Sequence, residues 1–583
     1  MHFRALILCV AAAFALPATG ALADGGPIMS LSEVQAGMDC TGETVIQGTA
    51  LSSFDVRVIG VVQEPGEGAR ILVRASGPAV AGTGIAQGFS GSPVYCPDAF
   101  GTMRNAGAIS EGVGDFGNYD ALVTPIEQML GEPVNAPRSA PRFTARVRPL
   151  LGPLTVGGLS PGMLNVLQAA GRRVGRVVLA APAGSATSFP VQALVPGASV
   201  AASYSVGAIP MGAVGTVTYR DGSTVYAFGH ELDGAGRRAL LLQDAYVYSV
   251  IGNPLGQSYK FAAPGHTEGT LTSDTPNGVL GVVGQPPPLV PVNVTANDLD
   301  TRNVLRLETE VADETDVGLP LGTSLVDLVA PVAAGQAAAQ IYNGPPANES
   351  GRMCVTLRLR ESRQPLAFCN RYVGTGLAGD SAPGPPELAA GVTTDLAAAF
   401  GLLEQVQFAT LHVENVSIRI DARRGLLEGT IVGVRAPRRV RAGQLVTVHL
   451  RVRRFRGAVE GVAFKLRIPA GSRHVLTGTL QGPPPPAPPM SPTSTVTGSL
   501  VAVLGGGSAS APPPPAPTSM QTLRSEFAAI STYDGLRIRW NGGGPRPAYR
   551  DPALLITGAI RLRFDVVGAT GGRRRPASRH RTF

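Results

Sequence analysis

Short runs in which apolar and polar residues alternate make up most of the first 284 residues. In the first part of this region the runs are separated by glycine and proline, and they lie at 43–47, 55–62, 70–75, 92–95, 107–110 and 122–124. Strands of this length and spacing are typical of a small antiparallel barrel. A following segment, 125–130, begins with proline and is predicted to be a short helix. We therefore expect an N-terminal β unit over residues 24–135.

The same alternation predicts a second β unit over residues 149–284. A helix is expected near 162–170, and strands are expected at 174–179, 198–203, 212–219, 224–228 and 245–250. The sequence Asp221-Gly222 predicts a tight turn between two of these strands. The resulting hairpin places His230 at the end of its second strand.

The C-terminal half is also predicted to be rich in strands. Residues 291–421 are expected to form a β-rich domain with one helix near 396–405. Residues 425–570 resemble an immunoglobulin-like β domain that is interrupted by two proline-rich segments. The basic residues 571–583 are predicted to be a disordered tail. The predicted fold class is therefore mainly β, with two small barrel-like units followed by β-sandwich domains.

The N-terminus and the composition indicate export. Residues 1–23 begin with basic side chains, continue through an apolar run and end in Ala21-Leu22-Ala23, which is the pattern of a cleaved signal peptide. No later segment offers about eighteen uninterrupted apolar residues, so no membrane span is expected in the mature chain. The 74 glycines and 50 prolines among 583 residues predict many turns and few long helices. We expect an exported protein, either periplasmic or secreted.

The cysteine count fits the same compartment. Four cysteines remain once the signal peptide is removed, and an even number in an exported chain favours two disulfides. Cys354 and Cys369 flank a hairpin-like stretch, so we expect them to pair, which leaves Cys40 to pair with Cys96. No histidine or second cysteine lies at the spacing of a metal site, so no metal is predicted.

The charge pattern gives no reason to expect a nucleic-acid partner. The net charge of +8 comes almost entirely from arginine, since Lys260 and Lys465 are the only lysines. The basic residues cluster only at 438–456 and in the tail. Export makes a nucleic-acid partner less favoured still, and none is predicted.

The stretch most suggestive of chemistry is 88–93, Gly-Phe-Ser-Gly-Ser-Pro. A serine between glycines can occupy a tight turn on which its Oγ is exposed and consecutive backbone N–H groups point at one place. Ser90 is then a candidate nucleophile, and the amides of Gly88 and Ser90 are candidate oxyanion donors. The alternative is an ordinary turn between strands, in which Gly and Ser are common residues.

His230 gives the serine a candidate partner. A serine on a glycine turn and a histidine at a strand end, in adjacent β units of an exported protein, suggest a serine peptidase with its site between two barrels. His230 would accept the proton of the Ser90 hydroxyl. The alternative is a histidine that only caps a loop, and among the other histidines only His266 competes.

Residues 29–284 resemble the peptidase domain of the stage IV sporulation protein B (SpoIVB) family. The resemblance rests on the stretches 37–38, 44–49, 54–61, 88–94, 124–130, 215–218, 229–230, 269–271 and 278–281. In that family the first serine of a Gly-Met-Ser-Gly-Ser-Pro motif attacks the substrate, and this serine corresponds to Ser90. The resemblance implies that His230 is the catalytic histidine, and a chymotrypsin-like peptidase architecture is expected.

The chain departs from that family in three respects. The serine segment precedes the histidine segment here, and no PDZ-like segment is visible. The family's catalytic aspartate lies about fifteen residues before the nucleophile, where this chain has no carboxylate. Asp120 is our preferred third residue because it belongs to the same unit as Ser90, with Asp55, Asp233 and Asp244 as alternatives. A serine–histidine dyad is equally allowed.

Three functions follow as hypotheses. The first is an exported serine endopeptidase that needs no cofactor, forms an acyl-enzyme and cleaves envelope or extracellular proteins, possible self-processing included. The second is a catalytically inactive, peptidase-derived module that binds or scaffolds envelope partners through its immunoglobulin-like region. The third is a structural envelope protein in which the glycines only shape turns, and it predicts that Ser90 and His230 lie far apart.

Overall fold

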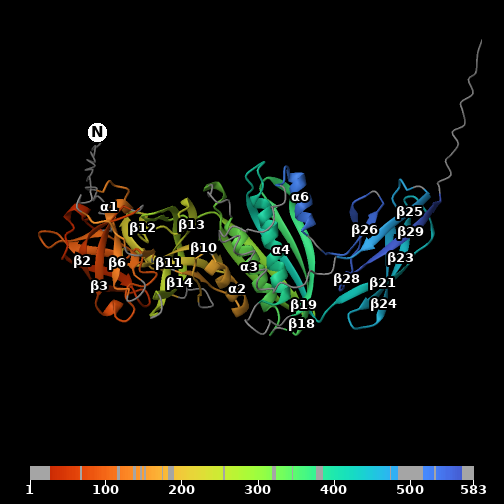
Figure 1. Cartoon of the computed structure of the whole chain (residues 1–583), viewed down its shortest axis with the longest axis horizontal. Coiled ribbons are helices and arrows are strands. Elements are labelled where there is room, and N and C mark those ends of the chain that lie inside the picture. Colours follow the sequence, from red (N-terminus) through yellow and green to blue (C-terminus); the bar gives the residue numbers. More distant parts are fainter. Residues whose placement is uncertain are drawn as a thin grey trace, which may run out of the picture.

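A computed structural model of the chain describes 26–65, 68–114, 118–134, 140–144, 147–149, 153–173, 175–181, 189–253, 257–317, 324–344, 346–375, 385–472, 474–483, 516–530, 533–541 and 543–567. The predicted signal peptide, nearly all of the two proline-rich segments and the basic tail lie outside these residues. Figure 1 shows the described units following one another in chain order along the long axis of the molecule.

The first unit, which we call barrel 1, is a closed ring of six strands, as the alternating pattern predicts. The strands are β1 (Asp39–Val45), β2 (Leu51–Glu64), β3 (Gly68–Ser76), β4 (Pro93–Pro97), β5 (Met103–Val113) and β6 (Asp120–Pro125). They are ordered β4-β1-β2-β3-β6-β5, and pairing of β4 with β5 closes the ring. In β2 the side chains of Phe54, Val56 and Val58 are buried while their neighbours are exposed, which is the alternation of a strand with one face on a core.

Short elements complete barrel 1. They are η1 (Leu31–Glu33), η2 (Pro78–Val80), α1 (Ile126–Met129) and β7 (Val147–Pro149). The predicted helix at 125–130 corresponds to α1, which directly follows β6. Strand β7 pairs with β5 on the outside of the ring.

The second unit, barrel 2, is formed by another six strands whose pairings return to their starting point. They are β10 (Ser199–Gly207), β11 (Met211–Asp221), β12 (Thr224–Ala227), β13 (Gly236–Ile251), β14 (Tyr259–Thr275) and β15 (Gly278–Val283). The order is β10-β13-β14-β15-β12-β11, and β10 also pairs with β11. Strands β8 (Leu154–Val156) and β9 (Val178–Ala180), with α2 (Pro161–Arg173) between them in sequence, extend the sheet beyond β11.

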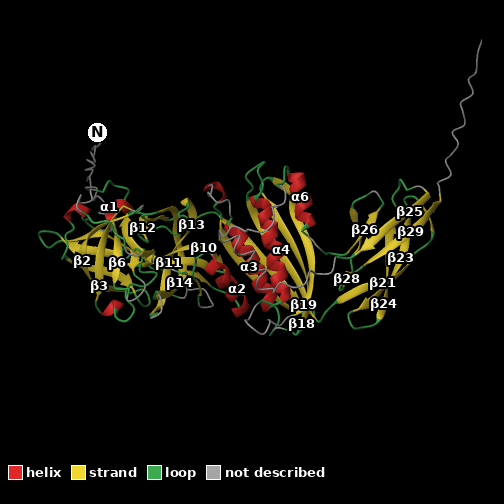
Figure 2. Cartoon of the chain, in the orientation of Figure 1, coloured by secondary structure: helices red, strands yellow, loops and turns green. Residues whose placement is uncertain are grey.

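Barrel 2 continues without a break into a third unit, because β10 also pairs with β17. This sheet runs β17 (Asn303–Ala312), β16 (Leu289–Asp298), β20 (Val413–Arg424), β18 (Asn348–Leu359) and β19 (Ser362–Thr375). Helices α3 (Leu325–Gln340) and α4 (Glu387–Glu404) pack against each other and against this sheet, as Figure 2 shows, and η4 (Thr315–Val317) precedes α3.

Only one of these two helices is predicted from the sequence. The expected helix near 396–405 corresponds to the end of α4. Helix α3 is rich in alanine and valine, and every residue from Val326 to Ala338 is buried. A helix that is buried all round has no polar face, so the apolar period that would mark it in a sequence is absent.

The C-terminal unit consists of two sheets that share one hydrophobic cluster. One sheet is ordered β24 (Val459–Arg467), β23 (Leu445–Arg454), β21 (Glu428–Arg435) and β28 (Leu555–Thr557). The other is ordered β22 (Arg439–Arg441), β29 (Ala559–Val567), β25 (His474–Gln481), β26 (Leu536–Trp540) and β27 (Pro545–Tyr549). Helix α6 (Met520–Ala529) leaves this unit and packs on β19, where Phe527 meets Phe368 edge to face.

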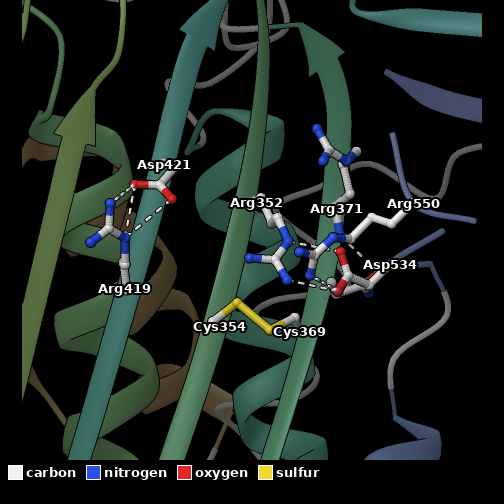
Figure 3. The surroundings of a disulfide bond; sticks show 9 residues. Arg352, Cys354, Cys369, Arg371, Arg419, Asp421, Asp534 and Arg550 are labelled. Atoms are coloured by element: carbon white, nitrogen blue, oxygen red, sulfur yellow. Dashed lines mark hydrogen bonds and ion pairs between the residues drawn. A yellow bond between two sulfur atoms is a disulfide. The ribbon is translucent and has the colours of Figure 1, made fainter. Parts of the chain in front are cut away.

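Both predicted disulfides are confirmed. Cys40–Cys96 joins β1 to β4, and Cys354–Cys369 joins β18 to β19. Figure 3 shows the second bond beside Asp534, whose carboxylate accepts two hydrogen bonds of 2.7 Å from Arg352 and so ties the C-terminal unit to the third sheet. Two disulfides are consistent with the predicted export. None of the described helices is long and apolar enough to cross a membrane.

Candidate functional site

The glycine–serine turn lies where barrel 1 meets barrel 2. Its backbone is bonded to β11: the Thr216 amide donates to the Ser90 carbonyl at 2.8 Å, and the Thr218 hydroxyl donates to the Gly91 carbonyl at 2.8 Å. The turn leads directly into β4, which the Cys40–Cys96 bond ties to β1. The turn is therefore held from both barrels.

Gly91 makes the close approach of the two barrels possible. Its φ is +91°, and a Cβ at this position would lie 1.9 Å from the Thr216 carbonyl oxygen and 2.5 Å from the Phe228 nitrogen. Any side chain would therefore collide with the backbone of barrel 2, in addition to the strain of a left-handed conformation. The glycine after Ser90 is required here by packing between barrels as well as by the turn.

The amides of the turn divide into two groups. Those of Phe89, Gly91 and Ser92 donate to backbone carbonyls at 2.8–2.9 Å. The amides of Gly88 and Ser90, in contrast, have no acceptor among the described residues. These are the two donors that the sequence predicts for an oxyanion, and they remain available for a ligand.

Ser90 itself is fully enclosed. Its side chain has no exposed area, and its Oγ has no hydrogen-bond partner within the described part of the chain. Ser92, two residues later, is equally buried, and its Oγ also lacks a partner there. Buried hydroxyls normally have a hydrogen-bond partner, so two without one mark a place where another group could bind.

His230 lies next to the turn. After β12 the backbone bends at Phe228 (φ +69°) and Gly229 (φ +70°), and the Thr124 hydroxyl of barrel 1 donates to the Gly229 carbonyl at 2.6 Å. A Cβ on Gly229 would lie 3.3 Å from the Ile109 carbonyl oxygen, which is the oxygen that accepts from the Gly91 amide. Gly91 and Gly229 thus flank one carbonyl, and the structure brings Ser90 and His230 to the same interface.

The His230 ring is oriented by a backbone oxygen. Its Nδ1 lies 2.6 Å from the Glu231 carbonyl, which can only accept, so Nδ1 carries the hydrogen and Nε2 carries the lone pair. Nε2 is buried without a partner among the described residues. Burial lowers the pKa of His230 to about 4, and the nearby Arg70 charge adds to this effect. At neutral pH the ring is therefore an uncharged proton acceptor.

Within the described ranges, no carboxylate lies beside Nδ1 of His230, which contacts the Glu231 carbonyl instead. Asp120 lies across the ladder from Arg74, and its carboxylate accepts two hydrogen bonds of 2.7 and 2.8 Å from that guanidinium at the surface of barrel 1. The structure therefore does not bring Asp120 to His230, contrary to the preferred prediction. Asp120 belongs to the same unit as Ser90, but the pairing register of β3 and β6 places its side chain against Arg74.

The three alternative aspartates do not contact His230 in the described part of the chain either. Asp233 accepts from Tyr204 at 2.8 Å and pairs with Arg238 at 3.0 Å. Asp244 is fully buried and accepts from His266 Nδ1 at 3.0 Å, so this carboxylate orients the His266 ring. No serine hydroxyl among the described residues bonds to His266. The His230 ring is thus oriented by the Glu231 carbonyl, and no hydrogen bond joins its Nε2 to Ser90 Oγ.

Lys260 is a residue that motif reasoning misses. It lies on β14, is fully buried, and donates from Nζ to the hydroxyls of Thr44 at 2.8 Å and Thr216 at 3.1 Å. No motif surrounds it, and a single lysine in a strand is usually a surface residue. The signal that could have pointed to it is rarity: only two lysines occur among 49 basic residues.

Acid is expected to destabilise the protein through His230. The pKa of this histidine is about 4 when folded and about 6.5 when unfolded, so the unfolded chain binds the proton first and stability falls as the pH drops from 6.5 to 4. The shift corresponds to about 3 kcal/mol. Urea unfolding at pH 7, 5.5 and 4.5 should show this loss, and His230→Asn should show a smaller dependence. An equal dependence in both proteins would contradict a buried neutral His230.

No protein-family model, curated protein or solved structure matches this chain.

Proposed function

We propose that the protein is an exported serine endopeptidase in which Ser90 is the nucleophile and His230 is its general base. The observation that carries this proposal is a set of four groups at one interface that have no hydrogen-bond partner among the described residues: Ser90 Oγ, His230 Nε2 and the amides of Gly88 and Ser90. A neutral imidazole nitrogen, a serine hydroxyl and two free N–H donors on the serine turn are the groups that acyl transfer requires once they are brought together. Two six-stranded barrels with the site between them are also the expected chymotrypsin-like arrangement.

The proposed reaction follows from these groups. Ser90 Oγ attacks the carbonyl carbon of a peptide bond while its proton passes to His230 Nε2, and the carbonyl oxygen becomes an anion held by the amides of Gly88 and Ser90. Collapse of this intermediate breaks the C–N bond, and the amine leaves with the proton from Nε2. Water then attacks the ester through the same base, which releases the acid and restores Ser90.

In place of a carboxylate, the Glu231 carbonyl holds the His230 ring. A carbonyl fixes the tautomer as an aspartate does, but it supplies no negative charge to stabilise the imidazolium that forms. Burial, which lowers the pKa of His230 to about 4, disfavours the imidazolium further. We therefore expect a slow enzyme compared with one that has a complete triad.

Access to the site is closed in this structure. The Ser90 side chain has no exposed area and His230 is 5% exposed. A peptide cannot reach Oγ through a closed interface, so the proposed activity requires a movement that opens it. Proteins of the envelope or extracellular space are the proposed substrates, and a segment of the chain itself is another candidate.

The same burial favours a second candidate function. A peptidase-derived module that has lost catalysis would keep the turn and the histidine as packing elements, closed to solvent and without a carboxylate. Its proposed activity is binding or scaffolding in the envelope through the C-terminal sheets, for which an immunoglobulin-like sandwich is the proposed arrangement.

The experiment that separates the two functions is labelling with a fluorophosphonate, which reacts with activated serines. The purified mature protein is treated before and after limited proteolysis, and the labelled residue is located by peptide mass spectrometry. The enzyme predicts a label on Ser90 that is lost in His230→Asn, a variant whose amide still donates to the Glu231 carbonyl. Absence of label from the folded protein in both states would support the binding module.

A further inference from the structure

Lys260 is a buried cation whose surroundings hold no opposite charge. Its side chain lies between β1, β11 and the glycine–serine turn, where it meets the hydroxyls of Thr44 and Thr216 and the ring of Phe89, whose centroid is 5.1 Å from Nζ. None of these groups is charged, and Lys260 forms no ion pair with a described carboxylate. Burial of an ammonium without a counter-ion costs free energy, so packing alone gives no reason for a lysine here.

Both the backbone and the side chain of Lys260 contact the segment that carries Ser90. Its backbone amide donates to the Gln87 carbonyl at 2.9 Å, and its stem lies so close to the turn that a Cβ on Gly88 would be 3.1 Å from the Lys260 Cβ. The aliphatic part of the side chain therefore packs directly against Gly88, while Nζ extends over the Phe89 ring.

A relay of hydrogen bonds connects the Lys260 ammonium to Gly88 through Thr216. The Thr216 hydroxyl donates to the Gly88 carbonyl at 3.0 Å. Since a hydroxyl has one hydrogen, Thr216 Oγ1 must accept from Lys260 Nζ. The Thr216 amide meanwhile donates to the Ser90 carbonyl. Thr216 thus fixes the carbonyls on both sides of Phe89, and Lys260 fixes the Thr216 hydroxyl.

We propose that Lys260 is a positioning residue of the Ser90 site, which acts through Thr216 and Phe89 to hold the Gly88 and Ser90 amides in the orientation that receives an oxyanion. The inference rests on the proposed peptidase function and adds a residue to it. The positive charge of the ammonium, which lies over the ring of Phe89 in the turn, also favours negative charge at the amides. No contact joins Nζ to Ser90 Oγ, so Lys260 is not assigned the role of base.

The protonation state of Lys260 then gives the site a second pH dependence. Burial lowers the pKa of Lys260 to about 7, and its neighbours on β1, β11 and the turn (Thr44, Thr216 and Phe89) do not titrate in this range. The ammonium is therefore lost as the pH rises through 7, while His230 loses its proton near pH 4. Acylation of Ser90 is expected to be fastest between these values and to slow on both sides.

The test measures the rate of fluorophosphonate labelling from pH 5 to 9 in three proteins. Wild type is expected to slow as the pH rises through 7. Lys260→Met is expected to react at least tenfold more slowly at pH 6 and to lose this decrease. Lys465→Met is the matched control, because Lys465 is the only other lysine and lies in the C-terminal unit, where its Nζ donates to Thr447. It should behave as wild type.

Two threonine variants keep the test valid if Lys260→Met does not fold. Thr216→Val and Thr44→Val each remove one acceptor of Nζ, but only Thr216 continues the relay to Gly88. Thr216→Val should lower the labelling rate at least tenfold at pH 6, and Thr44→Val should lower it much less.

Equal rates and pH profiles in wild type, Lys260→Met and Thr216→Val would overturn the role of Lys260 while the peptidase stands. Absence of labelling in wild type at every pH, both before and after limited proteolysis, would instead refute the peptidase, and the role of Lys260 with it.

Discussion

Ser90→Ala is expected to abolish both fluorophosphonate labelling and hydrolysis of unfolded protein substrates, with a loss of rate of at least about a thousandfold. The substitution removes the proposed nucleophile and leaves the amides of Gly88 and Ser90 in place. Because Ser90 Oγ makes no hydrogen bond with the described residues, its removal breaks no contact, and the melting temperature should stay close to that of wild type. Casein cleavage and thermal unfolding measure the two properties.

Ser92→Ala is the matched control for this prediction. Ser92 is in the same motif, is equally buried and also has an unpartnered Oγ, but its amide is already bonded to the Phe89 carbonyl. We expect this variant to keep at least about a third of the wild-type rate. Loss of activity in Ser92→Ala together with its retention in Ser90→Ala would move the nucleophile to Ser92. Equal loss in both would indicate that the motif matters for its packing.

The second large effect is expected on stability, from Gly91→Ala. The new Cβ would lie 1.9 Å from the Thr216 carbonyl oxygen and 2.5 Å from the Phe228 nitrogen, and both atoms belong to backbone that cannot move without breaking β11 or the segment after β12. Positive φ adds about 1–2 kcal/mol of strain. Overpacking against backbone adds about 3 kcal/mol or more. We expect a loss of about 4 kcal/mol or failure to fold, measured by urea unfolding.

Gly82→Ala separates the collision from the strain. Gly82 has a similar φ of +75°, yet a Cβ there would meet no atom within 4 Å. This variant should lose only about 1–2 kcal/mol, which is the cost of the left-handed conformation alone. If Gly91→Ala were no less stable than Gly82→Ala, the two barrels would not be in contact through this turn.

The residues themselves explain which parts of this architecture could be predicted. Alternation in β2 and in β12 is visible because each of these strands has one face on a core, and the turn between β11 and β12 then determines where His230 emerges. The disulfide pairs follow from an even count and one local hairpin. These features depend on short stretches of sequence.

Features that depend on contacts between distant segments could not be predicted in the same way. Helix α3 is buried on all sides and shows no polar face. The sequence places Asp120 in the same unit as Ser90, whereas the register between β3 and β6 pairs it with Arg74. Lys260 is surrounded by β1, β11 and the serine turn. Its two hydroxyl partners, Thr44 and Thr216, lie 216 and 44 residues away in the sequence. Only the assembled barrels bring those groups together.

The strand β10 determines how the interface between the barrels can open. It pairs with β11 and β13 inside barrel 2 and, at its end, with β17 of the next sheet, so barrel 2 and the third unit share one hydrogen-bonded ladder. Separating them would break a continuous ladder. Barrel 1 belongs to a different sheet and is joined to barrel 2 by isolated backbone bonds, at Gly48 with Val247, at Gln87 with Ser258 and Lys260, and at Ser90 with Thr216. We therefore expect that a movement which exposes Ser90 shifts barrel 1 against barrel 2 and leaves the ladder between barrel 2 and the third unit intact.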